Sequence, residues 1–143
     1  MPHLVILYTA QLDAETDMGR LCRQLADTML TVKDEAGKQV FPTGGTRVLA
    51  YPAAHHAVAD GGAAGRAAGG TGDYAFVYLN LRMGKGRSAA THKQAGDSLL
   101  ACAQAHFEPL FARRHIGLTL QIDEGPEVFD AKHSNLHPLF NKN

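Results

Sequence analysis

Pro2 is the first residue of this sequence whose position suggests chemistry, because it follows the initiator methionine in the opening stretch MPHLVILY. While Met1 is attached, Pro2 has a tertiary amide nitrogen and no acid–base chemistry. If Met1 is removed, Pro2 carries a free amine whose pKa starts near the α-amino value of roughly 7.7–8.0. Such an amine is a usable general base near neutral pH. The residues alone leave both possibilities open.

A second candidate site is the turn GKGRS at 84–88, which joins an expected strand to an expected helix. A helix N-terminus offers free backbone N–H groups and a positive dipole to an anion. Arg87 adds a planar guanidinium that suits a carboxylate or a phosphate. Gly86, Arg87 and Ser88 are therefore candidates for anion binding, and the alternative is a solvated arginine beside a tight turn. The GxxxxGK[ST] spacing of a P-loop is missing.

A similar but weaker pattern is GGTR at 44–47, where a flexible glycine pair precedes Arg47. Taken alone, this arginine is best interpreted as a surface residue on a turn.

Metal and nucleophile chemistry find little support in the sequence. The eight histidines do not form a cluster with the spacing of a metal site, so we expect no metal. Cys22 and Cys102 lie in apolar periodic segments and are best interpreted as small buried side chains in a reducing compartment. The carboxylates at and just after the end of the last expected strand are explained by a solvated turn: Asp123, Glu124 and Glu127.

The composition indicates a globular protein of one domain, 143 residues long. Lys+Arg and Asp+Glu are equal at 14 each, which argues against nucleic acid or an anionic membrane as the main partner. The opening lacks the basic region of a signal peptide, and no apolar stretch is long enough to span a bilayer. We expect a cytoplasmic protein.

Hydrophobic periodicity predicts the elements that must position these residues. Asp13 is expected to cap the first helix and Ser88 the second, which runs through Phe111. Pro52 is expected to interrupt a weak strand within 47–60. The Gly/Ala-rich segment 61–72 reads as a flexible surface loop or a mobile lid. The expected order is strand 3–9, helix 18–32, weak strand 47–60, strand 73–83, helix from 89, and strand 115–124.

This order predicts an α/β (α+β) fold of two tandem βαβ units in a single domain, 1–143. The units form pseudo-repeat halves of about 1–60 and 73–143, joined by the loop 61–72. A four-stranded sheet covered by two helices on one face leaves its other face open. Self-association is the simplest way to cover that face.

Several stretches together resemble the 5-carboxymethyl-2-hydroxymuconate isomerase family of the tautomerase superfamily. The stretches are MPH, FPTGGTR (41–47), DYAFVYLNLRMGKGRS (73–88), KQAGDSLL with AHFEPLF (93–111) and KHSNLHPLF (132–140). The resemblance runs nearly end to end, and the N-terminal proline and the GKGRS block are its specific parts. Residues 33–40 and the Gly/Ala segment look like insertions, and Leu49 stands where the family carries a second arginine.

The resemblance implies a tautomerase-like homotrimer and a cofactor-free reaction in the breakdown of aromatic acids such as homoprotocatechuate. A 2-hydroxy-dienoate would be converted to its conjugated keto isomer. The family's proline base falls on Pro2, so the resemblance implies that Met1 is removed. The family's two arginines fall on Arg47 and Arg87. These arginines would hold the carboxylates of a di- or tricarboxylate and offset dienolate charge in the transition state. Burial and arginine charge would lower the pKa of the Pro2 amine further.

Two alternatives remain open from the sequence. One keeps the proline but hydrates or dehalogenates another unsaturated acid, which needs a carboxylate that activates water, with Glu124 and Glu127 as candidates. The other is a non-catalytic trimer that binds small acids, for which a retained Met1 would argue.

Overall fold

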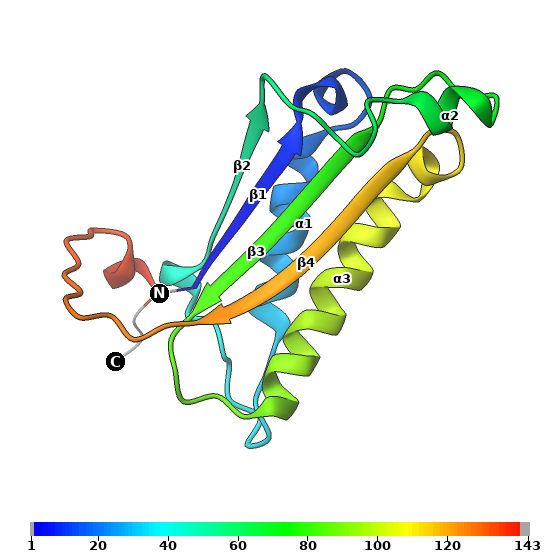
Figure 1. Cartoon of the computed structure of the whole chain (residues 1–143). Coiled ribbons are helices and arrows are strands. Elements are labelled where there is room, and N and C mark those ends of the chain that lie inside the picture. The colour runs from blue at the N-terminus through cyan, green and yellow to red at the C-terminus, as the bar shows by residue number, and fades with distance from the viewer. Residues whose placement is uncertain (1, 141–143) are drawn as a thin grey trace.

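A mixed four-stranded sheet lies at the centre of the protein, whose computed structural model describes residues 2–140. The strand order is β2-β1-β3-β4. The strands are β1 (His3–Thr9), β2 (Arg47–Ala53), β3 (Ala75–Met83) and β4 (Ile116–Glu124). Two long helices, α1 (Met18–Thr31) and α3 (Ala89–Phe111), lie side by side on one face of the sheet (Figure 1). The expected α/β (α+β) fold with two βαβ units is confirmed.

The strand pairing places the start of β1 next to the end of β3. β1 pairs in parallel with β2, so that His3 lies opposite Arg47. β1 pairs antiparallel with β3, so that the same His3 lies opposite Arg82. β4 then joins β3 in parallel, with Asp123 opposite Arg82. Residues from four distant parts of the sequence therefore meet at one end of the sheet.

Alternation along the strands decides which side chains enter the core. In β3 the fully buried residues are Val77, Leu79 and Leu81, as the sequence pattern predicts. They pack against the apolar stripes of α1 and α3, which include Leu21, Leu25, Met29, Leu99 and Phe107. Among the described residues, no helix lies over the other face of the sheet (Figure 1). Its large exposed apolar side chains are Leu7, Leu49 and Tyr51.

The first helix begins later than its expected cap, Asp13. A 3-10 helix, η1 (Ala10–Ala14), intervenes, and the Asp13 carboxylate accepts a hydrogen bond of 2.6 Å from the Tyr8 hydroxyl. Asp17 caps α1 instead, because its side chain accepts the backbone N–H of Arg20 at 3.0 Å. The expected cap of α3 is confirmed, since Ser88 Oγ accepts the Thr91 N–H at 3.1 Å.

The Gly/Ala-rich segment differs from the flexible loop expected there. It contains a short helix, α2 (Ala63–Ala67), and the Asp60 carboxylate accepts the N–H groups of Gly62 and Ala64, each at 2.9 Å. Gly62 has φ +110°, and a Cβ there would lie 2.3 Å from the Gly72 carbonyl oxygen. The segment lies at the opposite end of the sheet from the N-terminus (Figure 1), so it does not cover Pro2 of its own chain.

Pro52 does not interrupt the second strand. β2 runs through it to Ala53, because β2 is an edge strand, the kind of strand in which proline is tolerated.

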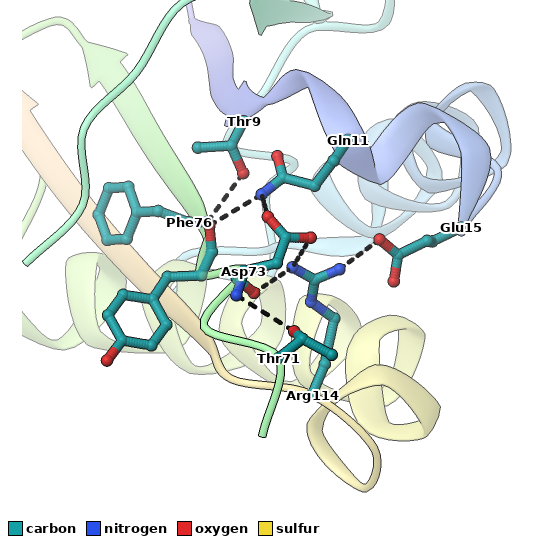
Figure 2. A network of polar contacts seen from close by, with 8 residues as sticks. Thr9, Gln11, Glu15, Thr71, Asp73, Phe76 and Arg114 are labelled. Carbon is teal, nitrogen blue, oxygen red and sulfur yellow. Dashed lines mark hydrogen bonds and ion pairs between the residues drawn. The ribbon is translucent and has the colours of Figure 1, made fainter. Parts of the chain in front are cut away.

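A polar network holds the end of the sheet where α2 lies (Figure 2). The Arg114 guanidinium pairs with the Glu15 carboxylate, and its Nη2 donates to the Asp73 carbonyl oxygen at 2.7 Å and the Asp73 carboxylate at 3.1 Å. Gln11 Nε2 donates to the Tyr74 carbonyl oxygen at 2.8 Å, and Thr9 Oγ1 accepts the Phe76 N–H at 3.0 Å. This network ties η1, the start of β3 and the end of α3 together.

After β4 the chain leaves the sheet and forms an extended tail, 125–140, that returns to the vicinity of the N-terminus (Figure 1). The tail ends in a 3-10 turn, η3 (His137–Leu139), which packs against η2 (Thr43–Gly45). Val128 and Phe129 of the tail are 102% and 86% exposed. Across residues 2–140, the helices are too short or too polar to cross a bilayer.

Candidate functional site

Pro2 lies at the end of the sheet where β3 leads into α3. Because β1 and β3 are antiparallel, the start of β1 adjoins the turn 84–88. Pro2 is buried and lines a cavity of about 420 Å³, here called the proline cavity. Its lining residues are Pro2, Val40, Phe41, Pro42, Met83, Gly84, Lys85, Arg87, Lys132 and His137. The amine candidate and the Arg87 guanidinium therefore share one cavity with an apolar wall.

Arg87 is held on one side by the chain that precedes β2. Its Nη2 donates to the Val40 carbonyl oxygen at 3.0 Å. The preceding Gly86 has φ +108°, a left-handed conformation that glycine adopts without strain. Lys85 also lines the cavity, so Arg87 and Lys85 are two of the cations that share it with Pro2. Such a pair can hold a carboxylate close to a buried base.

Ser88 and the start of α3 are already engaged with a carboxylate of the protein itself. The Ser88 hydroxyl donates to the Glu35 carboxylate, and Thr91 Oγ1 donates to the same side chain at 3.4 Å. The hydrogen bond from Ser88, followed by one from the backbone N–H of Glu35, lowers the pKa of Glu35 below its ordinary 4.5. Within the described chain, Ser88 and Gly86 do not line the proline cavity.

Arg47 lines a neighbouring cavity rather than the proline cavity. This second cavity, of about 480 Å³, is here called the His3 cavity. It is lined by His3, Arg47, Arg82, Met83, Gly125, Glu127, Asp130, Ala131, Lys132 and His133. Met83 and Lys132 line both cavities, so the two adjoin. Arg47 Nη1 donates to the Gly45 carbonyl oxygen at 3.2 Å.

Arg47 and Arg82 give the His3 cavity positive charge close to His3. The pKa of His3 lies below the ordinary 6.5, first because of burial and then because of the nearby Arg47 and Arg82 charges. His3 is therefore neutral at pH 7. Lys132 pairs with Asp130 at 2.6 Å, which offsets part of the local charge.

The carboxylates considered for water activation lie outside the proline cavity. Glu124 Oε1 is 3.6 Å from His92 Nε2 at the first turn of α3. Glu127 lines the His3 cavity with Arg47. Across residues 2–140, no group of three His, Cys, Asp or Glu side chains is placed to hold a metal ion.

Several residues of the two cavities had no separate signal in the sequence. Lys85, Arg82, Lys132 and His137 belong to stretches that carry the resemblance, but their spacing alone did not mark them as a site. In the sequence, Arg82 occupies an ordinary polar position of the alternating stretch 73–83, so nothing there indicates a site. Lys132 and His137 reach the site only because the tail folds back, which periodicity does not predict.

Comparison with known proteins identifies relatives over the whole chain. The profile of the family described as 5-carboxymethyl-2-hydroxymuconate isomerase matches residues 2–140. The 5-carboxymethyl-2-hydroxymuconate Delta-isomerase of Escherichia coli is 29% identical over 140 residues, covering 98% of this chain and 99% of the relative.

Two solved structures share both sequence and fold with this chain. One, a 5-carboxymethyl-2-hydroxymuconate delta-isomerase, is 63% identical with a TM-score of 0.97, covering 100% of this chain and 95% of the other. The second is a 5-carboxymethyl-2-hydroxymuconate isomerase from Deinococcus radiodurans R1. It is 34% identical with a TM-score of 0.80, covering 99% of this chain and 95% of that one.

Proposed function

Because the chain belongs to the 5-carboxymethyl-2-hydroxymuconate isomerase family, we propose that it converts this 2-hydroxy-dienoate to its conjugated keto isomer without a cofactor. One observation carries the proposal. A buried proline at position 2 shares a cavity with Arg87 and Lys85. This arrangement suits proton transfer within an acidic, unsaturated substrate.

In the proposed reaction, the Pro2 amine takes the proton from the 2-hydroxyl group. The O–H electron pair forms the carbonyl, the double bonds shift along the chain, and the remote carbon takes the proton back from the Pro2 ammonium. The amine is free only after Met1 is removed, and Met1 lies outside the described residues. Burial of Pro2 and the charge of Arg87 both disfavour the ammonium form, which keeps the base available at neutral pH.

Arg87 and Lys85 have two tasks in this proposal. They bind a substrate carboxylate, and they stabilise the negative charge that spreads over the dienolate in the transition state. The bond from Arg87 to the Val40 carbonyl oxygen fixes the guanidinium before the substrate arrives, which reduces the cost of ordering it.

The proposal includes a homotrimer in the cytoplasm. The uncovered sheet face with Leu7, Leu49 and Tyr51 and the exposed tail residues Val128 and Phe129 support self-association. Cys22 and Cys102 are free thiols, which suits a reducing compartment. Light scattering on the purified protein should give three times the chain mass of 15.3 kDa, and a monomer would contradict the trimer.

The test is ultraviolet-monitored ketonisation of 5-carboxymethyl-2-hydroxymuconate, with intact mass showing that Met1 is absent. We expect turnover by the wild-type protein and a loss on the order of 10²-fold or more in kcat for Pro2→Ala. Pro52→Ala, an exposed proline on β2, is the matched control and should keep full activity. Full activity of Pro2→Ala would exclude the proline base, and binding without turnover would favour the non-catalytic alternative.

A further inference from the structure

We infer that the His3 cavity is a second anion subsite, in which Arg82 and Arg47 bind the end of the substrate that carries two carboxylates. The inference rests on the proposed function and extends it to substrate selection. Arg82 would be the residue that distinguishes a tricarboxylate from a dicarboxylate.

Strand register brings the two guanidinium groups to the same side of the sheet. Arg47 and Arg82 each lie opposite His3, one on β2 and the other on β3. Both line the His3 cavity, and the tail forms part of its wall with Glu127 and residues 130–133. A Cβ at Gly125 would lie 3.5 Å from Arg82 Nη2, so the start of the tail passes close to this guanidinium.

The charges in the cavity leave Arg82 available for a ligand. Lys132 is paired with Asp130, and the carboxylate opposite Arg82, Asp123, accepts a 2.8 Å hydrogen bond from Asn80 Nδ2. Among residues 2–140, Arg82 forms no ion pair with a carboxylate within 4.0 Å. Glu127 is the remaining carboxylate of the lining. Burial first, and then the charges of Arg47 and Arg82, lower the pKa of His3 between them.

Adjacency lets one molecule occupy both cavities. The shared residues Met83 and Lys132 separate the Pro2 side from the Arg82 side. The substrate's carbon chain ends in a carboxylate beside the 2-hydroxyl group. At its other end, carbon 5 carries both the second terminal carboxylate and the carboxymethyl group. Charge matching places the single carboxylate with Arg87 and Lys85, and the pair with Arg47 and Arg82.

The apolar patch proposed for self-association does not conflict with this subsite. Leu49 lies opposite Val5, and Tyr51 lies opposite Leu7, further along the strands than the row of Arg47, His3 and Arg82. The charged row is at the end of the sheet, where the tail departs.

The experiment compares 5-carboxymethyl-2-hydroxymuconate with 2-hydroxymuconate, which lacks the carboxymethyl group. In Arg82→Gln we expect the ratio of kcat/KM values, tricarboxylate over dicarboxylate, to fall about tenfold or more, mainly through KM. Arg82→Lys keeps the charge but not the planar, bidentate hydrogen bonding of the guanidinium. It should therefore recover part of the kcat/KM ratio. Arg113→Gln, an exposed arginine after α3, makes the same charge change and should leave the ratio unaltered. An unchanged ratio in an active Arg82→Gln protein would overturn the inference.

A binding measurement separates failure of this inference from failure of the proposed function. If the wild-type protein turns over neither acid, the proposed function fails, and calorimetry with propane-1,2,3-tricarboxylate and glutarate tests the subsite directly. Weaker tricarboxylate binding by Arg82→Gln than by Arg113→Gln would support the subsite. Equal binding, or no binding by the wild-type protein, would exclude it.

Discussion

At the scale of single residues, the site combines groups that the sequence marks and groups that it does not. Pro2 and Arg87 stand in patterns with a chemical meaning, an N-terminal amine and a turn before a helix. Glu35 has no such pattern, yet its carboxylate accepts the hydroxyls of Ser88 and Thr91 next to Arg87. Only the folded chain brings these residues together, because 53 positions separate Glu35 from Ser88.

Glu35 provides a prediction at this scale. In Glu35→Ala, the first turn of α3 loses a carboxylate partner, so its backbone amides should exchange hydrogen faster, and the KM of the isomerase should rise. Glu35→Gln retains an acceptor for Ser88, so its amide exchange rates should lie between those of the wild type and Glu35→Ala. Hydrogen–deuterium exchange of peptides covering 84–92 measures the effect.

The matched control for this change is Glu108→Ala, an exposed glutamate near the other end of the same helix. It should leave exchange at 84–92 unaltered. Equal exchange in wild type and Glu35→Ala would show that the carboxylate does not order the turn.

At the scale of elements, hydrophobic periodicity was a good guide to the core and a poor guide to the connections. The alternation of β3 and β4 and the stripes of α1 and α3 are confirmed, since burial selects side chains at fixed spacing. The connections depend on local polar bonds that periodicity does not register. Asp13 bonds to Tyr8 instead of capping α1, and Asp60 organises α2 inside a segment that resembles a flexible linker.

Arg114 gives the prediction for these connections. Its side chain is only 11% exposed and joins Glu15 and Asp73, so Arg114→Ala leaves a half-buried carboxylate and a carbonyl without their donor. We expect a loss of about 2 kcal/mol in the free energy of unfolding. Urea denaturation measures it.

Arg23→Ala serves as the comparison, because its pair with Asp27 is exposed at 66% and 64%. The free energy of unfolding of Arg23→Ala should stay within about 0.5 kcal/mol of the wild-type value. Equal losses in both variants would mean that the network of Figure 2 adds nothing beyond a surface pair.

At the scale of the whole molecule, two partly buried histidines connect folding with pH. The pKa values of His3 and His106 both lie below the ordinary 6.5 because of burial, and next because of Arg47 and Arg20 respectively. The unfolded chain therefore binds these protons at a higher pH than the folded chain. The contribution of these two neutral histidines to the free energy of unfolding is therefore present above pH 6.5. It is lost as the pH falls toward their lowered pKa values in the folded protein.

We expect the free energy of unfolding to decrease on acidification below about pH 6.5. His106→Gln should make this decrease shallower while the amide replaces the 2.8 Å contact with Thr16 Oγ1. Denaturation curves at several pH values test this, with His55→Gln, an exposed histidine, as the control. A slope unaffected by His106→Gln would exclude this histidine as a source of the pH dependence.

The antiparallel pairing of β1 and β3 has a consequence for how the two ends of the molecule differ. The strand order β2-β1-β3-β4, with β1 and β3 antiparallel, relates β1 to β3 and β2 to β4 by half a turn about an axis through the middle of the sheet. The start of β2, with Arg47, corresponds to the start of β4, which Arg114 precedes by two residues. At the α2 end, Glu15 and Asp73 neutralise that guanidinium. At the Pro2 end, the arginines and lysines line two cavities instead. The α2 end therefore holds the elements together, and the Pro2 end presents cationic side chains to a ligand.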